Sequence, residues 1–383
     1  MLCNAPLEEG PEARAMFVDT HFHLSWSARS KIDLNLKDCK SVEEVLLRVR
    51  REAERGGTYK GWVVGTLLPL KLARSLDRFA LDEASPEVPV SLATRDGHMA
   101  VANTKALKLG GVSCEDEGAE CEDGKLTGRL YESAMRKLRR VIPDPDTMLL
   151  YKAFKAVLDE LKDGGVVEVH SMTSRWLEME IVNKIKHDVK VYHYVRTETY
   201  IPGAVGVKLF VDGVIVHGTA MTEGKGRLYV PLERLVAWIK KGKEEGFQVA
   251  VHVMGDEALD VVLKAFKLAG SPKRVLRIEH AALVRDDQLE PLAEAGVPVS
   301  VQPGIMEAVG VEEFKRILGN RWKEFMRVKD MLEAGVRVYG GSDHPVGPWR
   351  FEEIKKYYKL LWRPPSEEEV LKLHTSGHEM VEG

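Results

Sequence analysis

Short apolar runs alternate with amphipathic segments from residue 161 to the end of the chain. Three of the helical segments, residues 231–246, 256–270 and 285–296, each end at a glycine, the residue that most often terminates an α-helix. The apolar, β-branched runs are residues 165–172, 189–195, 205–213, 247–255, 275–283, 297–303 and 336–345. Nearly continuous apolar strands that alternate with helices indicate a parallel sheet covered by helices.

An eighth run of the same kind lies far upstream, at residues 17–24 (FVDTHFHL). Eight strand–helix repeats over this length favour a (β/α)8 TIM barrel, an α/β fold. The alternative is a doubly wound open sheet, but the glycine-rich turn that usually follows its first strand is absent. We therefore expect a closed barrel whose first strand lies in residues 17–24.

The segment between the first and second predicted strands is far too long for one crossover helix. It contains a helical pattern at 41–57, a strand pattern at 61–68 and a mixed segment at 88–111. We expect an insertion on the barrel rim, where the substrate-facing loops of such barrels lie. The predicted division is a barrel domain at 16–27 and 161–383 and a rim insertion at 28–160.

Composition excludes some classes of protein. The chain has 383 residues, 44% of them hydrophobic, and a formal net charge of −3. No basic block or stripe indicates a nucleic-acid partner, and no stretch reaches the ~18 apolar residues of a membrane span. Residues 1–15 lack the apolar and basic regions of a signal peptide. We expect a soluble, cytoplasmic protein that binds a small molecule, and the pattern allows a homo-oligomer.

The cysteines do not form a metal-binding motif. Cys3, Cys39, Cys114 and Cys121 include no C-x-x-C pair, so a zinc knuckle is excluded. Cys114 and Cys121 lie in an acidic, glycine-containing loop, where we expect free thiols. A local disulfide between them is the alternative.

Two histidines share one face of the first predicted strand. Side chains at positions i and i+2 of a strand point to the same side, so His21 and His23 face the same way. Two such imidazoles could hold one metal ion. Taken alone, the pair is also typical of ordinary core or surface histidines.

Other polar residues lie near the carboxyl ends of later strands, where the active sites of TIM barrels form. His252, His280 and Asp343 each lie at such an end, and Lys208 lies inside the apolar segment GVKLF. A lysine in an apolar strand is rarely buried without a partner or a function. Because several nitrogen and oxygen ligands converge on one barrel mouth, we predict a metal site there.

The remaining histidines have weaker claims. His170 and His193 lie on strands but lack a paired partner, and we expect them to be core or pocket-lining residues. His217 follows a predicted strand and is expected near the rim. Three more fall in helical or terminal segments and are expected to face solvent: His187, His374 and His378.

Six segments together resemble the amidohydrolase superfamily of metal-dependent hydrolases: FVDTHFHL, VKLFVDG, VAVHVMGDEALDVVLKAF, RIEHAALV, SVQP and GVRVYGGSDHPV. They are most similar to the amidohydrolase family 3 branch, which includes N-substituted formamide deformylases and relatives labelled "exoenzyme regulatory". RDGHMAVANTKAL resembles part of that branch's rim insertion. The resemblance spans most of residues 17–380. The family usually has a small β-sandwich, which we expect to be missing or reduced here, either because this is a trimmed or minimal member or because the sequence is a fragment.

The resemblance implies a site with two divalent ions, usually zinc. The implied ligands are His21, His23 and Asp343 for the first ion, His252 and His280 for the second, and Lys208, carbamylated by CO2, as the bridge. A buried lysine has a lowered pKa, so the neutral amine that reacts with CO2 is available. Asp19 shares the strand parity of the histidine pair and would orient the imidazoles, with a strand-end cap as its alternative role.

The same resemblance implies hydrolysis of a non-peptide carbon–nitrogen bond in an amide or formamide. Water activated by the metals would attack a metal-polarised carbonyl, with Asp343 as general base and then general acid. His98 and Glu132 of the insertion would contact the substrate, although a helix cap or loop role suits Glu132 equally well.

Two alternatives stay open. The same metal site would serve a deaminase or an ester or lactone hydrolase. A non-catalytic regulatory or binding protein could also keep the barrel, but such a protein would be expected to lose ligands, and all six are present in this chain.

Overall fold

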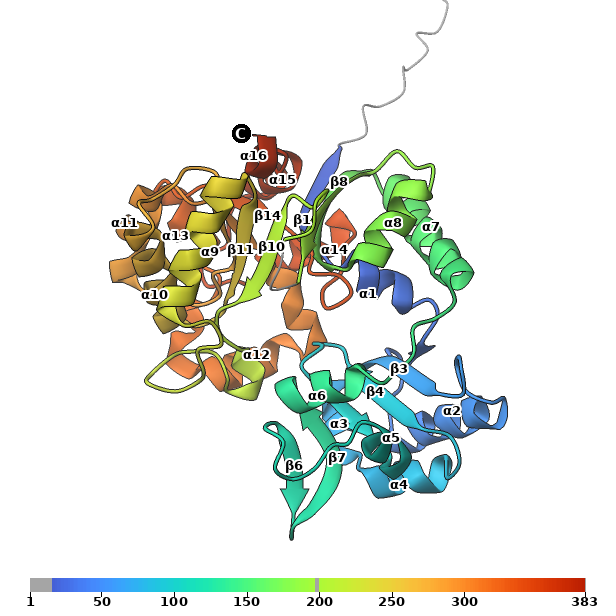
Figure 1. The fold of residues 1–383 in the computed structure, drawn as a ribbon. Helices are drawn as coiled ribbons and strands as arrows, with labels where there is room; N and C mark the ends of the chain where they lie inside the picture. The colour runs from blue at the N-terminus through green and yellow to red at the C-terminus, as the bar shows by residue number, and fades with distance from the viewer. Residues whose placement is uncertain (1–15, 197–199, 383) are drawn as a thin grey trace, which may run out of the picture.

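Eight parallel strands and the helices around them form a TIM barrel, as predicted (Figure 1). The computed structural model describes residues 16–196 and 200–382. The barrel strands are β1 (Phe17–Phe22), β8 (Val166–Ser174), β9 (Lys190–Val195), β10 (Gly206–Phe210), β11 (Gln248–Val253), β12 (Leu276–His280), β13 (Val299–Val301) and β14 (Val338–Gly340). They follow one another in that order, and each neighbouring pair is parallel.

The barrel closes where the chain beyond β14 meets β1. The backbone N–H of Asp343 donates to the carbonyl of His21 at 2.7 Å, and that of His23 donates to the carbonyl of His344 at 3.0 Å. These bonds join segments from opposite ends of the sequence. The residues that follow β1 and β14 therefore face each other across the closing seam.

Helices cover the outside of the barrel. They are α1 (Leu24–Arg29), α7 (Thr147–Asp163), α8 (Trp176–Lys184), α9 (Leu232–Glu245), α10 (Asp256–Leu268), α11 (Asp286–Ala295), α12 (Val311–Leu318), α13 (Val328–Glu333), α14 (Phe351–Tyr358), α15 (Glu367–Thr375) and α16 (Glu379–Glu382), with 3-10 turns η1 (Ile215–His217), η2 (Pro303–Ala308) and η3 (Gly319–Glu324). Two of the three predicted glycine stops cap their helices directly: α9 and α11 end at Gly246 and Gly296, whose φ angles of 75° and 62° favour glycine. Helix α10 ends at Leu268, and Gly270 follows its cap residue Ala269. Among the described residues, no helix has the length and apolar character needed to cross a membrane.

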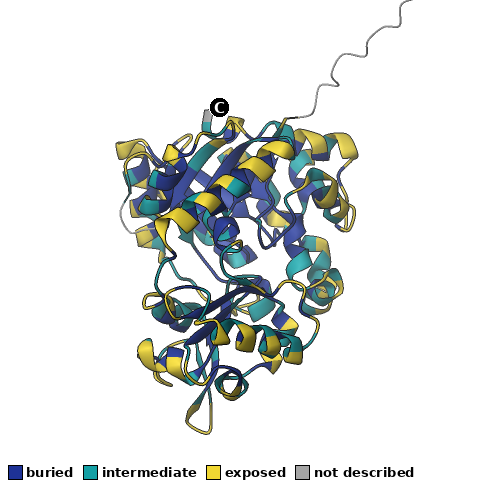
Figure 2. Cartoon of the chain, turned by 90° about the vertical axis from the view of Figure 1, so that its right-hand side faces the viewer, coloured by how far each residue is buried: buried dark blue, intermediate teal, exposed yellow. Residues whose placement is uncertain are grey.

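Most of the apolar core of the barrel lies between the strands and the outer helices. Figure 2 shows that the barrel strands are largely buried, whereas the outer helices have exposed residues. Inside the barrel the buried side chains are largely polar, and Arg277 and Glu279 of β12 are fully buried. Arg277 donates to Glu279 Oε1 at 2.5 Å, to His170 Nδ1 at 2.7 Å and to the hydroxyl of Tyr194 at 3.0 Å. A hydrogen-bonded network thus occupies space that branched aliphatic residues fill in most TIM barrels.

The chain between β1 and β8 forms a second, mixed sheet (Figure 1). Its strands, in spatial order, are β2 (Leu34–Asn35), β3 (Val63–Leu68), β4 (Val90–Thr94), β5 (Met99–Ala102), β7 (Lys125–Tyr131) and β6 (Ala119–Glu122). Its helices are α2 (Val42–Glu54), α3 (Leu70–Ser75), α4 (Arg78–Ala84), α5 (Thr104–Leu109) and α6 (Glu132–Arg139). Helix α2 begins where the Ser41 side chain accepts from the N–H of Glu44, a typical N-cap.

Helix α7 lies within the range 28–160 over most of its length but packs on the barrel. Its Leu150, Phe154 and Leu158 share one apolar cluster with Phe22 of β1 and Val169 of β8. The helical layer of the barrel therefore begins before residue 161.

Two local expectations are wrong. Cys114 and Cys121 form a disulfide, because the turn before β6 brings their Cα atoms to 5.9 Å. Cys39 is a buried free thiol, and Cys3 lies outside the described residues. His374 is buried rather than solvent-facing, because α15 packs its ring against β14 and within 3.1 Å of the Tyr358 hydroxyl.

Candidate metal centre

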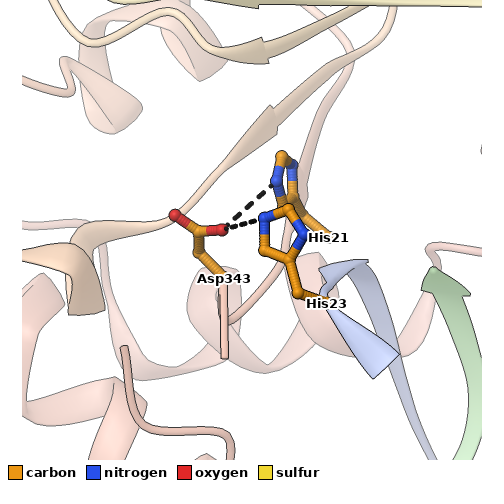
Figure 3. Close-up of side chains that lie close together, drawn as sticks. All are labelled: His21, His23 and Asp343. Carbon is orange, nitrogen blue, oxygen red and sulfur yellow. Dashed lines mark ion pairs between the residues drawn. The ribbon is translucent and has the colours of Figure 1, made fainter. Parts of the chain in front are cut away.

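Three side chains meet at the closing seam of the barrel. His21, His23 and Asp343 each offer one ligand atom, and these atoms all lie within 4.8 Å of one another. Asp343 Oδ1 is 3.0 Å from His23 Nε2 and 3.3 Å from His21 Nε2. Figure 3 shows both imidazoles turned towards the carboxylate. Nitrogen and oxygen donors at this spacing suit a divalent ion such as zinc.

The backbone around these residues is shaped to bring them together. A Cβ on Gly341 would lie 2.7 Å from the Cβ and N of His21, so only glycine allows the chain that follows β14 to pass this closely. Asp19 Oδ1 accepts from the N–H groups of Ser342 at 2.9 Å and His21 at 3.1 Å. Asp19 therefore ties the two ligand-bearing backbones together through their N–H groups.

A second group of predicted ligands lies beside the first. The ring centroid of His280 is 4.8 Å from that of His21 and 4.6 Å from that of His252. Lys208, in the middle of β10, is almost completely buried. His252 donates from Nε2 to the carbonyl of Gly213 at 3.0 Å, which leaves its Nδ1 as the free ligand atom.

Unpartnered buried atoms test whether this site fits a metal. Four of them belong to the cluster and have no hydrogen-bond partner among the described residues: His21 Nε2, Asp343 Oδ1, His280 Nδ1 and Lys208 Nζ. A buried polar group without a partner costs about 1–3 kcal/mol, so four in one place need an explanation. Bound cations would satisfy the imidazole and carboxylate atoms, so the residues fit the group.

Burial and neighbouring charges tune these groups. Burial lowers the pKa of His252 and His280 well below the usual range, and the charges of His280 and His21 respectively lower them further. Burial would raise the pKa of Asp343, but His21 and His23 outweigh it and hold that pKa well below its ordinary value. Burial also lowers the pKa of Lys208 to about 8. Neutral imidazoles and an ionised carboxylate are the forms that bind metals.

The cluster opens into a cavity of about 920 Å³ whose wall comes from both the barrel mouth and the insertion. His98 and Glu132, the two predicted substrate contacts, both line it. His98 donates from Nδ1 to Glu132 Oε1 at 2.6 Å, and the His98 ring centroid is 6.3 Å from that of His252. The insertion thus places a hydrogen-bonded pair opposite the candidate ligands.

Comparison with models of protein families decides to which family the chain belongs. Residues 15–368 match the model described as amidohydrolase family. The chain belongs to the amidohydrolase family. The resemblance inferred from the motifs is thereby confirmed, and the chain is a metal-dependent hydrolase.

Comparisons with individual proteins agree with this family assignment. This amidohydrolase is 26% identical over 390 residues to the N-substituted formamide deformylase of Arthrobacter pascens, covering 88% of this chain and 71% of that protein. The crystal structure of an uncharacterized metal-dependent hydrolase from Pyrococcus horikoshii has a TM-score of 0.75 and 26% identity, over 96% of this chain and 81% of that one. A second, from Pyrococcus furiosus, has a TM-score of 0.72 and 27% identity, over 96% and 82% of the two chains.

The amidohydrolase site also contains residues that sequence reasoning missed. His21 donates from Nδ1 to Glu279 Oε2 at 2.6 Å, and His23 Nδ1 is hydrogen-bonded to Thr173 Oγ1 at 3.1 Å. Such contacts fix which ring nitrogen faces a metal. Glu279 directly precedes His280, so strand alternation places them on opposite faces. The left-handed φ of 74° at His280 breaks that alternation. In the sequence, only the presence of an acid inside the apolar run LRIEH could have indicated a role for Glu279.

The other histidines lie away from the cluster, and three of them have partners of their own. His170 is a buried core residue that donates from Nε2 to Glu168 Oε1 at 3.0 Å, and burial lowers its pKa to about 4. His193 is also buried, 2.9 Å from Ser174 Oγ. His217 donates from Nε2 to Asp96 Oδ2 of the insertion at 2.7 Å. His187 is half-buried and His378 is exposed.

Proposed function

We propose that this amidohydrolase cleaves the carbon–nitrogen bond of a non-peptide amide or formamide at a site that holds two zinc ions. The observation that carries the proposal is the convergence of unpartnered buried ligand atoms from four strands or strand ends on one cavity. The relative named N-substituted formamide deformylase supports a formamide or a similar small amide as the substrate.

The ions would be held by the residues that the motifs indicate. We assign His21, His23 and Asp343 to the first ion, His252 and His280 to the second, and Lys208 to both. The chemistry supplied by bound divalent ions is polarisation of a carbonyl and a lowered pKa of water. Lys208 Nζ is buried without a hydrogen-bond partner among the described residues, which suits conversion to a carbamate better than an isolated ammonium.

The side chains of the protein have separate tasks. The ionised Asp343 carboxylate takes a proton from the attacking water and returns it to the leaving nitrogen. Glu279 keeps the proton of His21 on Nδ1, so that Nε2 presents its lone pair to the cluster. His98 and Glu132 contact the substrate from the insertion side of the cavity.

A metal-loading experiment tests the proposal. The purified protein would be stripped, reloaded with zinc in the presence of bicarbonate, and analysed for metal content by mass spectrometry. Activity would then be screened on N-formyl amines, N-acyl amines, cyclic amides, esters, lactones and aminopyrimidines. We expect about two zinc ions per chain and turnover confined to amides or formamides.

Two variants sharpen the result. Lys208→Ala should lose metal and activity together, whereas His193→Gln, a buried strand histidine outside the cavity wall, should keep both. Full metal content and activity in Lys208→Ala would refute the carbamate bridge. Turnover of only esters or aminopyrimidines would replace the amide substrate, and a metal-loaded protein inert on the whole panel would refute the enzymatic function.

A further inference from the structure

Several arginines line the cavity, and most of them are already neutralised by acids. Arg29 pairs with Asp144 at 2.7 Å, and Arg136 pairs with Glu132 at 3.1 Å. Arg196 lines the same cavity but makes no hydrogen bond or ion pair with another described residue. Its side chain is open to the solvent of the cavity.

Arg196 is held close to the candidate metal ligands by an aromatic ring. Its guanidinium carbon lies 4.6 Å from the centre of the Phe210 ring, a cation–π arrangement. The same Phe210 ring is 5.1 Å from the ring centroid of His252 and 5.4 Å from Lys208 Nζ. One aromatic ring therefore separates the Arg196 guanidinium from the candidate ligands His252 and Lys208.

The charges around Arg196 do not balance. Glu132 is the nearby acid, but it already accepts from both His98 and Arg136. The walls of the cavity partly shield Arg196 from water and so lower its pKa; the positive charge of Arg136 lowers it further, and the negative charge of Glu132 raises it. An arginine stays protonated in proteins regardless, so among the described residues no acid is left to neutralise the Arg196 guanidinium.

We propose that Arg196 binds a carboxylate of the substrate, so that the substrates are amides or formamides that carry an acid group, such as N-formyl or N-acyl amino acids. The planar fork of a guanidinium matches the two oxygens of a carboxylate. One free arginine beside Glu132 supplies a single charge, which suits a carboxylate better than a doubly charged phosphate. This inference rests on the proposed hydrolysis of a carbon–nitrogen bond.

Matched substrates test the inference. N-formylphenylalanine and N-formylphenethylamine differ only in the carboxylate, as do N-acetylphenylalanine and N-acetylphenethylamine. The zinc-loaded enzyme should prefer the acid of each pair, mainly through a lower KM. Arg196→Met should lower kcat/KM for the acids by about 10–100-fold and leave the neutral amides unchanged, as expected for loss of one charge-assisted pair.

Two further variants control the experiment. Arg196→Lys keeps the charge but not the fork and should restore part of the preference. Arg227→Met removes another arginine of the cavity wall, one that is paired with Glu117, and should leave the preference for acids unchanged. Arg196 is exposed, so its replacement should not alter the melting temperature.

A binding measurement separates this inference from the proposed function. 3-Phenylpropionate cannot be hydrolysed, and its affinity for the zinc-loaded protein is measured by calorimetry. Loss of about 10-fold or more in Arg196→Met supports the carboxylate site even if no amide is turned over. Equal turnover of acid and neutral amides, or equal binding of 3-phenylpropionate by wild type and Arg196→Met, overturns the inference while leaving hydrolysis itself standing.

Discussion

The contact between His21 and Glu279 makes a quantitative prediction about metal affinity. Replacing Glu279 by Gln keeps the size of the side chain and its hydrogen bond to the imidazole but removes the negative charge. In the wild type, the Glu279 carboxylate accepts a hydrogen bond from His21 Nδ1 at 2.6 Å and another from Arg277 at 2.5 Å. Without that charge, the imidazole of His21 becomes a weaker electron donor and its orientation is less firmly set.

The size of the effect follows from the kind of bond that is lost. A hydrogen bond to a charged group contributes about 1.5–3 kcal/mol, against about 1 kcal/mol for a neutral one. The difference, about 0.5–2 kcal/mol, corresponds to roughly a 2–30-fold loss of affinity for the ion on His21. Glu279→Gln should therefore weaken metal binding without abolishing it.

Competition with a chromophoric chelator measures this affinity directly. The stripped protein would be titrated with zinc at fixed chelator concentration, and folding would be followed separately by urea unfolding of the metal-free protein. Glu168→Gln is the matched control, because Glu168 is also buried in the barrel interior but contacts His170 rather than a candidate ligand. This control should lose stability and keep the zinc affinity of the wild type.

One result would refute the reasoning. If Glu279→Gln folds and binds zinc within a factor of two of the wild type, the carboxylate does not tune His21. An equal loss of affinity in Glu168→Gln would mean instead that any disturbance of the polar interior reaches the metal site, so that the direct contact carries no special weight.

Three further predictions concern the scaffold. Burial lowers the pKa of His374 to about 4, so the unfolded chain binds more protons between pH 4 and 6.5. The free energy of unfolding should therefore fall as the pH drops through this window. Urea titrations should show that it depends less steeply on pH in His374→Gln than in the wild type, by up to ~1.4 kcal/mol per pH unit. An equal pH dependence in the two proteins would contradict the burial of a neutral ring. Gly341→Ala, which forces a Cβ to within 2.7 Å of His21, should cost about 1–3 kcal/mol of stability and weaken zinc binding, and a variant with wild-type melting and affinity would show that the seam can relax. Non-reducing peptide mapping should find Cys114 linked to Cys121, and the double serine variant should lose about 2 kcal/mol in chemical unfolding.

Much of the barrel was readable from local pattern. Each of the eight predicted apolar runs coincides with one of the strands β1 and β8–β14. Strand β8 extends two residues beyond its run, to Ser174, and the other strands are shorter than their runs, because the apolar pattern continues into the loops beyond the last ladder bond. The polar residues at strand ends were also readable, because parallel strands in a barrel place their carboxyl ends at one mouth. His374 shows where local pattern fails: its burial depends on which face of α15 meets β14.

The sequence by itself determined the order of strands and helices, the parity that places His21 and His23 on one side, and the family that the motifs indicate. These properties depend on neighbours within a few positions of the chain. Only the tertiary structure decided that Glu279 supports His21 across 258 positions, that Arg196 stacks on Phe210, and that Cys114 reaches Cys121. These distances are set by the closure of the barrel, by the left-handed backbone at His280 and by the docking of the insertion. None of these features produces a periodic pattern of apolar and polar residues in the sequence.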